Sequence, residues 1–575
     1  MSIISSSREC NTPGSSQKVV RFKLNYNLKS SLLRFANDKD SNLYEELLCH
    51  IRNVGQEIRD DDLTQLLKEA RGCISIIDGN FRLFVQVVLI LRWTHRSEEV
   101  IQEYQGFLQD LCSAHTYYTK VVLDHLTSSF KSDQYDWIDN SPSDKSIKCF
   151  NKLHQVIQSI IAVIPMSREL LLNSVNNNFP FVKKPAKEQQ SYVYNVLQIS
   201  QYEPSLHSEL LSAIINKMVT LDVHLPKSGL ECEGNNDTME VDGVFPLDKV
   251  SPDSEPSVAE SLDLCLLLLF KYLTLECHNE DGTLIWDKTK SLYSDLCKIF
   301  EDVILPTHAT HHVQFLIFYF LSFKKPTLGS NFLQMLWKKV SNANVAPVIR
   351  QASVCYIASL LTRAKYISLL VVKDMVSEMA NWLHSYVDNH DGSSSCFDHR
   401  VHSVFYTTCQ ALFYIIAFRH KDLVENKGLL HLQNLGLSKI VTCRLNPLRY
   451  CLPVVVSNFA SIARSYQLAY CYTIIERNSR NVLPVEYRDT TGCISPFSPV
   501  HFDSFFPFDP YHLKKSKVYI DPIYREYCGP PETKVAANSS SSKEEDDDDF
   551  LDTTIEHQSA RDVFSYGTSP GFLHV

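Results

Sequence analysis

The sequence predicts an all-α protein, specifically a HEAT-like helical repeat solenoid with an acidic internal loop and a disordered acidic C-terminal tail. Glycine accounts for only 17 of 575 residues, about 3% against a usual ~7%, which disfavours folds built on tight glycine turns. No glycine occurs between Gly106 and Gly229, and no proline occurs from 14 through 141 or from 348 through 446. Long stretches without these helix breakers favour α-helices.

Apolar residues recur at helical spacing along both halves of the chain, and strict alternation of apolar and polar residues is rare. A step of three or four residues places apolar side chains on one face of a helix, which then packs against its neighbours. The predicted core stripes are Phe81, Phe84, Val88 and Leu91; Leu153, Val156, Ile160 and Ile164; Leu206, Leu210, Ile214 and Met218; and Val354, Ile357, Leu361 and Ala364.

Prolines and shifts in composition predict how the chain is divided. Pro165, Pro180 or Pro185, Pro204 and Pro226 lie roughly 20 residues apart, the length of one helix and its turn, which indicates antiparallel helical pairs stacked in series. We predict a flexible N-terminus (1–30), N-terminal helical repeats (31–226), an acidic flexible loop (227–258), C-terminal helical repeats (259–487), a Pro- and aromatic-rich strap packed on the repeats (488–531) and a disordered acidic tail (532–575).

The negative charge of the chain is concentrated in two segments. The formal net charge is −10, and residues 227–258 carry −6 while residues 532–559 carry −7, which leaves about +3 for all other residues. A general nucleic-acid-binding protein normally carries a strong basic surplus. We therefore expect no direct sequence-specific DNA binding.

The cysteines and the N-terminus indicate a reduced compartment without a membrane. None of the 17 cysteines lies in a C-x-x-C pair, and several lie in apolar runs, so we expect buried thiols rather than disulfides or zinc ligands. The N-terminus has no apolar signal segment, and the longest apolar runs have seven residues, far short of the ~20 that cross a bilayer.

No motif for nucleotide binding or common hydrolytic chemistry is present. G-x-G-x-x-G, the P-loop, H-E-x-x-H and G-x-S-x-G are all missing, so we expect neither an enzyme nor a cofactor. His308, His311 and His312 have spacing that could bind a metal, but we interpret them as polar residues at the start of a helix. Residues 505–527 contain four bases and three acids, a near balance that favours a structural strap over a nucleic-acid surface.

Seven blocks of sequence resemble the RNA polymerase I-specific transcription initiation factor family, also called transcription initiation factor IA. Together they cover most of residues 150–527, and their joint order is highly specific. The blocks are FPFVKKPAKEQQSYVYNVLQIS (179–200), LPTHATHHVQFLIFYFLSF (305–323), FLQMLWKKV (332–340), RQASVCYIASLLTRAKYI (350–367), LNPLRYCLP (445–453), YCYTIIERNSR (470–480) and FFPFDPYHLKKSKVYIDPIY (505–524).

The resemblance implies a non-enzymatic HEAT-repeat protein of the nucleus and nucleolus. Such factors bind RNA polymerase I on its stalk and dock side and bridge it to the promoter-bound core or selectivity factor on ribosomal DNA. They are controlled by protein kinases and phosphatases, and a serine-rich surface of their N-terminal repeats is associated with the polymerase.

The resemblance also implies two contact segments. The stretch 332–350 resembles a segment linked to the polymerase, so Lys338, Lys339 and Arg350 are candidate polymerase contacts. The segment LLTRAK resembles one proposed to touch the promoter-bound factor. Because Leu361 and Ala364 lie on the predicted core face, the side chains expected at the surface there are those of Arg363 and Lys365.

Three serines in acidic context are candidate phosphorylation sites. Ser541 and Ser542 each have a glutamate three residues downstream, the spacing favoured by acid-directed kinases, and Ser251 precedes proline in the acidic loop. The alternative to the initiation factor is a nuclear HEAT-repeat transport or scaffold protein, which would not need the strap at 505–524. A nucleic-acid-binding protein is opposed by the nearly neutral body of the chain.

Overall fold

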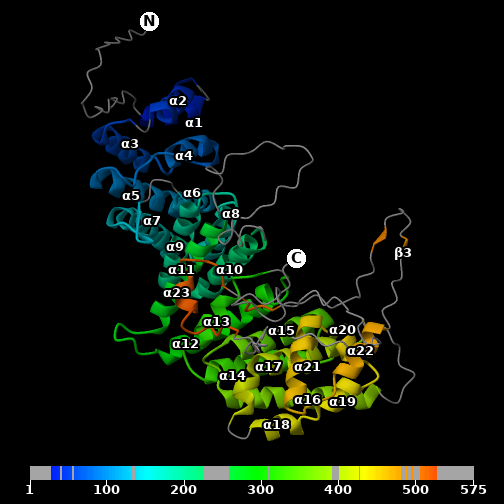
Figure 1. Cartoon of the computed structure of the whole chain (residues 1–575). Coiled ribbons are helices and arrows are strands. Elements are labelled where there is room, and N and C mark those ends of the chain that lie inside the picture. Colours follow the sequence, from blue (N-terminus) through cyan, green and yellow to red (C-terminus); the bar gives the residue numbers. More distant parts are fainter. Residues whose placement is uncertain are drawn as a thin grey trace, which may run out of the picture. The chain divides into compact units, whose positions relative to one another are not determined.

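The computed structural model of the chain is almost entirely helical in the residues that it describes. These residues are 28–38, 42–54, 57–131, 136–225, 258–308, 310–390, 400–425, 428–480, 487–488, 494–495, 506–509 and 511–527. Strands are confined there to two hairpins, β1 (Trp137–Ile138) with β2 (Ser141–Pro142) and β3 (Tyr487–Arg488) with β4 (Ile494–Ser495). The predicted all-α class is therefore confirmed (Figure 1).

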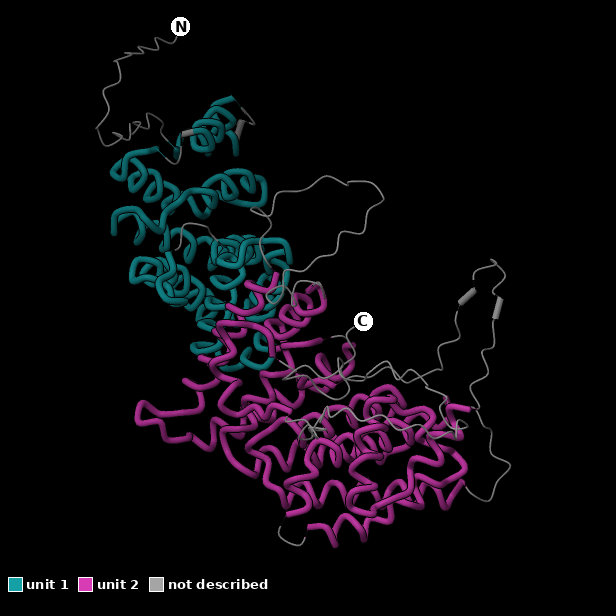
Figure 2. Tube along the Cα trace, viewed as in Figure 1, with its two compact units in different colours: residues 1–211 teal, residues 212–575 magenta. Residues whose placement is uncertain are grey.

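The chain forms two compact units, residues 1–211 and 212–575, which Figure 2 colours separately. In the first unit, helices two apart in the chain pack side by side, α3 against α5, α5 against α7 and α6 against α8. This is the stacking of antiparallel helical pairs. Its helices are α1 (Leu28–Asp38), α2 (Asn42–Val54), α3 (Asp60–Gly72), α4 (Arg82–Leu89), α5 (Glu98–Ala114), α6 (Thr119–Ser128), α7 (Asp144–Val163), α8 (Ser167–Asn178), α9 (Ala186–Tyr202) and the start of α10 (His207–Val223).

The predicted stripes lie in the cores of both units. Every stripe residue is buried except Ile164, which is half-buried at the C-terminal end of α7.

Local signals set both ends of α7. Ser143 accepts a hydrogen bond from the Ser146 N–H and caps its start, and Pro165 follows its end. The hairpin before α7 turns through Asp139 and Asn140, whose positive φ angles are typical of a two-residue turn.

The second unit is built around α17 (Ser403–Val424), which is buried along nearly its whole length. Helices α15, α16 and α21 pack on it, and α14 packs on α15. A helix that is apolar on all sides is stable only when its neighbours enclose it. The other helices of this unit are α11 (Val258–Cys277), α12 (Trp286–Ile299), α13 (Phe315–Leu321), α14 (Thr327–Ser341), α15 (Pro347–Arg363), α16 (Leu369–His390), α18 (Gly428–Asn434), α19 (Leu437–Thr442), α20 (Pro447–Tyr450), α21 (Pro453–Ser465), α22 (Tyr472–Arg480) and α23 (Lys517–Ile520).

The cysteines agree with the sequence expectation as far as the structure describes the chain. The described cysteines are free thiols, and most are buried. Burial raises the pKa of several of them, for example that of Cys265 to about 12, which keeps the thiol protonated at neutral pH. Across the described segments, no helix combines the length and apolar character needed to cross a bilayer.

Candidate partner-binding surface and the strap that shapes it

Residues 506–509 and 511–527, here called the strap, pack on the helices of the second unit. Phe508 is fully buried, with its ring 4.9 Å from that of Phe318 and 5.6 Å from that of Tyr356. Its backbone N–H donates to the Ser359 hydroxyl at 3.2 Å. The strap is therefore joined to α13 and α15 by aromatic packing and by a buried hydrogen bond.

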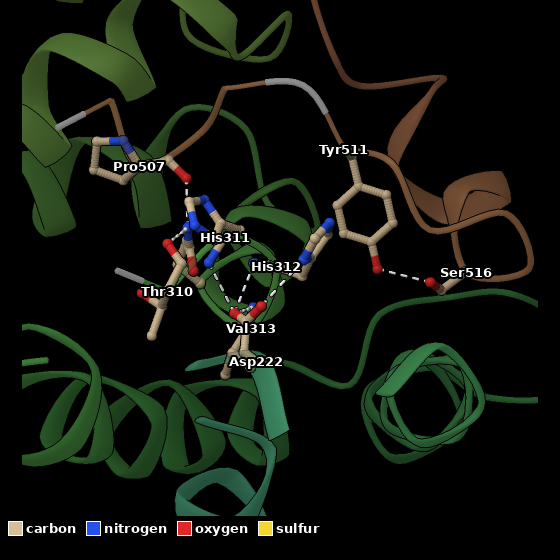
Figure 3. A network of polar contacts seen from close by, with 9 residues as sticks. Asp222, Thr310, His311, His312, Val313, Pro507, Tyr511 and Ser516 are labelled. Atoms are coloured by element: carbon tan, nitrogen blue, oxygen red, sulfur yellow. Dashed lines mark hydrogen bonds and ion pairs between the residues drawn. The ribbon is translucent and has the colours of Figure 1, made fainter. Parts of the chain in front are cut away.

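One buried carboxylate, that of Asp222, holds the turn that leads into α13 (Figure 3). Its Oδ2 accepts hydrogen bonds from the backbone N–H groups of His311, His312 and Val313 at 2.8–3.0 Å. Its Oδ1 accepts from His312 Nδ1 at 3.1 Å, and both side chains are inaccessible to solvent. Burial alone would raise the pKa of the Asp222 carboxyl. The hydrogen bonds from His312 and the backbone lower this pKa by more than burial raises it, so the net pKa is below its usual value.

The histidine cluster lies beside this carboxylate. His312 is buried, whereas His308 and His311 are exposed. No group of three or more His, Cys, Asp or Glu residues in the described ranges could hold a metal ion. The three histidines precede α13, which starts at Phe315.

The same turn contacts the strap. Gln314 Nε2 donates to the Pro507 carbonyl at 2.6 Å, and the Tyr511 ring lies edge-on to His312, 5.3 Å away (Figure 3). Tyr511 in turn shares a hydrogen bond of 2.7 Å with the Ser516 hydroxyl. The strap therefore rests on a turn that is itself organised by Asp222.

A second buried carboxylate, Asp263 on α11, holds the strap at the start of α23. Its oxygens accept hydrogen bonds from the backbone N–H groups of Lys515 and Ser516, each at 2.8 Å, and from the Ser516 hydroxyl. Lys515 also pairs with Glu260, one helical turn earlier on α11. These contacts satisfy two backbone N–H groups in the stretch that immediately precedes α23, which begins at Lys517.

Arg363 is buried, so the expectation that its side chain lies at the surface is wrong. The side chain is 0% exposed, and the guanidinium pairs with Asp509 at 3.1 Å and donates to the Arg525 carbonyl at 3.3 Å. The guanidinium also lies over the rings of Phe418 and Tyr524. The helical phase of α15 alone would turn Arg363 outward, but the strap folds back over this side chain and encloses it.

Lys365 is exposed, as expected. Its backbone N–H donates to the Ile523 carbonyl at 3.0 Å, Ala364 forms a β-bridge with Tyr524, and the Arg525 N–H donates to the Arg363 carbonyl at 2.7 Å. This short ladder fixes the backbone of residues 363–365 against the strap. The lysine side chain is thus presented to solvent from a rigid backbone.

The three candidate polymerase contacts lie together where α14 ends and α15 begins. Lys338 is exposed, and Lys339 is half-buried and pairs with Glu301 at 2.9 Å. Arg350 is half-buried, and its Nε donates to the carbonyl of Val340 at 2.8 Å. Desolvation by burial lowers the pKa of Arg350 from a very high usual value, and its guanidinium remains charged. Of the three, Lys338 is the most accessible cation.

The candidate phosphorylation sites Ser251, Ser541 and Ser542 lie outside the described residues.

Sequence reasoning missed Asp222, Asp263 and Asp509, the acceptors that organise the turn and the strap. Their partners are 89 to 253 residues away in the chain. No local pattern marks such residues, apart from an acid that directly precedes a long apolar run, as Asp263 does in α11.

Comparison with known proteins identifies the chain's relatives. The family model described as RNA polymerase I specific transcription initiation factor RRN3 matches residues 17–531. The chain is 38% identical to RNA polymerase I-specific transcription initiation factor RRN3 of Mus musculus over 510 residues, 82% of this chain and 76% of the relative. It is 28% identical to the factor rrn3 of Schizosaccharomyces pombe over 505 residues, 81% and 80% of the two chains.

A solved structure shares the fold. The crystal structure of RNA polymerase I transcription initiation factor Rrn3 superposes with a TM-score of 0.67 at 22% identity, covering 87% of this chain and 97% of the other. The predicted helical repeat fold is thereby confirmed. The matched family consists of transcription initiation factors and not enzymes, which confirms the expectation that the protein is not an enzyme. The chain belongs to the RNA polymerase I specific transcription initiation factor RRN3 family.

Proposed function

We propose that this protein binds RNA polymerase I and bridges it to the promoter-bound core or selectivity factor for transcription of ribosomal RNA genes. The observation that carries the proposal is the family match across residues 17–531. It is supported by relatives that are named RNA polymerase I-specific transcription initiation factors and aligned over more than four fifths of this chain. Such a factor works in the nucleus, and we place it in the nucleolus, where these genes are transcribed.

The polymerase contact in this proposal lies at the α14–α15 corner and faces the stalk and dock side of the enzyme. Lys338 is exposed there and forms no ion pair with any residue that the structure describes. Lys339 forms an ion pair with Glu301, and Arg350 donates a hydrogen bond to the Val340 carbonyl. An exposed cation steers an acidic partner and accelerates association, whereas paired cations mainly hold the corner together.

The contact with the promoter-bound factor lies at Lys365, and Arg363 acts as a positioning residue. Arg363 cannot touch a partner because its side chain is enclosed by the strap. It fixes the backbone ladder that presents Lys365. The LLTRAK segment thus combines one structural cation with one surface cation.

Control by kinases and phosphatases belongs to the same proposal. A phosphate adds about −1.5 to −2 charges, and on the nearly neutral N-terminal repeats this opposes docking by repulsion and desolvation. We expect Asp at exposed serines of these repeats, for example Ser113 and Ser141, to reduce polymerase binding strongly. Asp at Ser541 and Ser542 adds charge to an already acidic tail and should change binding little.

The test is co-purification of polymerase I and the promoter factor with single charge reversals in the full chain. Lys338→Glu should lower recovery of polymerase I about tenfold at physiological salt and leave the promoter factor bound. Lys365→Glu should lower recovery of the promoter factor and leave polymerase I bound. Lys290→Glu, an exposed lysine on α12, is the matched control and should change neither. If wild-type protein recovers no polymerase I, or instead recovers transport cargo, the proposed function is wrong.

A further inference from the structure

The last helices of the second unit carry a local excess of positive charge. Residues 437–480 contain six basic residues and one acid, a net charge of +5 in a chain whose formal net charge is −10. All six are exposed. We call this surface the basic end face, and it comprises Lys439, Arg444, Arg449, Arg464, Arg477 and Arg480 together with Tyr470 and Tyr472.

The described residues neutralise only part of this charge. Lys439 pairs with Asp388, and Arg480 pairs with Glu476. Arg444, Arg449, Arg464 and Arg477 form no ion pair with any residue in the described ranges, which leaves four arginines available to an external anion. Arginine is the side chain best matched to phosphate because its planar fork donates two parallel hydrogen bonds.

Tertiary contacts gather these arginines from separate elements. Helices α20 and α22 pack together, as Figure 1 shows. The amides of Asn446 and Asn478 exchange hydrogen bonds of 2.7 and 3.2 Å, which joins the stretch that contains Arg444 and Arg449 to the one that contains Arg477. At the other end of α22, the Arg464 guanidinium lies 5.6 Å from the centre of the Tyr472 ring.

Two tyrosines on this face offer their rings to solvent. Tyr470 is 87% exposed between α21 and α22, and Tyr472, the first residue of α22, is 47% exposed. The residues beside Tyr470, Ala469 and Cys471, are both buried, so its backbone is anchored while its ring projects outward. An anchored, exposed aromatic ring is a platform on which an unpaired base can stack, and stacking does not require a particular base.

We propose that the basic end face binds single-stranded nucleic acid without sequence preference, with Arg444, Arg449, Arg464 and Arg477 on the phosphates and Tyr470 stacking on a base. The nine residues of α22 extend about 13.5 Å, a length that spans more than one phosphate. An acidic polypeptide would satisfy the arginines equally well, but it would leave the exposed ring of Tyr470 without a stacking partner. This activity is independent of polymerase binding, and the charge balance of the whole chain conceals it.

The test is fluorescence anisotropy of the full-length purified chain with a 30-nucleotide oligo(dT), a 30-base-pair duplex and polyglutamate as probes. We expect oligo(dT) to bind at 50 mM salt and to weaken steeply as salt increases. The fourfold variant Arg444→Gln, Arg449→Gln, Arg464→Gln, Arg477→Gln should weaken this binding at least about tenfold and reduce the salt slope by about 3. Tyr470→Ser should weaken it about fivefold or more, and Tyr470→Phe should restore it.

The matched control removes the same charge from the first unit. Lys145, Lys148, Lys183 and Lys187 are exposed, and their joint replacement by Gln should change oligo(dT) binding less than about twofold. An equal loss in this control would mean general electrostatic attraction and would overturn the proposal. Tighter binding of duplex than of oligo(dT), or polyglutamate binding as tight as oligo(dT) with no effect of Tyr470→Ser, would also overturn it. Melting of each variant near the wild-type temperature shows that folding is intact.

Discussion

Two arginines of the second unit that lie over aromatic rings, Arg363 and Arg464, differ completely in exposure. Arg363 lies over Phe418 and Tyr524 in a site closed by the strap, and it is fully buried and paired with Asp509. Arg464 lies over Tyr472 at the basic end face, exposed to water. A buried cation is stable only when neighbouring groups replace its lost hydration, whereas an exposed one keeps its water and is available to a partner. The same residue types thus serve folding in one place and binding in the other.

Arg363→Ala should lower the free energy of unfolding more than any other change in this comparison. It leaves Asp509 and the Arg525 carbonyl without their buried partner, and we expect a loss of about 3–5 kcal/mol in the free energy of unfolding. Urea unfolding of the full chain measures it. Arg363→Lys should not restore stability, since an ammonium cannot reproduce the planar contacts. Lys365→Ala, two residues along, is the control and should cost less than about 0.5 kcal/mol; equal losses for the two would contradict the enclosed role of Arg363.

Asp222→Asn should lower the free energy of unfolding nearly as much, and it should also change how that free energy depends on pH. Asn cannot accept all the hydrogen bonds of the carboxylate, so we expect a loss of about 3 kcal/mol at pH 7. The pKa of Asp222 in the folded protein lies below its usual value. The stabilisation is therefore complete above the unfolded pKa of about 3.9 and is lost as pH falls through the folded pKa.

The difference in urea midpoint between wild type and Asp222→Asn should accordingly be constant near neutral pH and shrink below about pH 4. A difference that stays the same down to pH 3 would show that Asp222 is not ionised in the folded protein. Glu209→Gln, which changes an exposed carboxylate on the same helix, α10, is the matched control and should show almost no difference at any pH.

Asp263→Ala should loosen the strap while the helices persist. The backbone N–H groups of Lys515 and Ser516 lose their acceptor, a cost of about 1–2 kcal/mol. Hydrogen exchange should accelerate mainly in residues 511–527, and trypsin should cleave more readily after Lys514 and Lys515. Glu260→Ala removes only the exposed partner of Lys515 and should leave both measurements nearly unchanged. Unchanged exchange in Asp263→Ala would show that packing alone holds the strap.

Arg464→Ala should have the smallest effect on stability. Its contact with Tyr472 is exposed to water, and such cation–π contacts contribute about 0.5–1 kcal/mol at most. We expect a change of about 0.5 kcal/mol or less in urea unfolding. A loss comparable to that of Arg363→Ala would mean that the basic end face is a structural site, and the contrast between the two places would then fail.

The sequence by itself was sufficient for the fold class, the family and the core. Glycine-free and proline-free stretches predicted the helices, and the stripes through Phe84, Ile160 and Leu361 proved to be buried. These properties follow from local spacing, because a helix repeats every 3.6 residues and apolar side chains on one face must be removed from water. The ordered blocks of residues 179–524 were likewise enough to indicate the family.

Only the tertiary structure decided which charged residues are available to partners. Helical phase predicted that both Arg363 and Lys365 face solvent, but the strap, more than 140 residues away in the chain, covers one and exposes the other. The same holds for the basic end face, where a hydrogen bond between Asn446 and Asn478 gathers arginines that are spread along the sequence. Burial of a charge depends on every segment that packs around it, and pairings across such distances leave no periodic trace in the sequence.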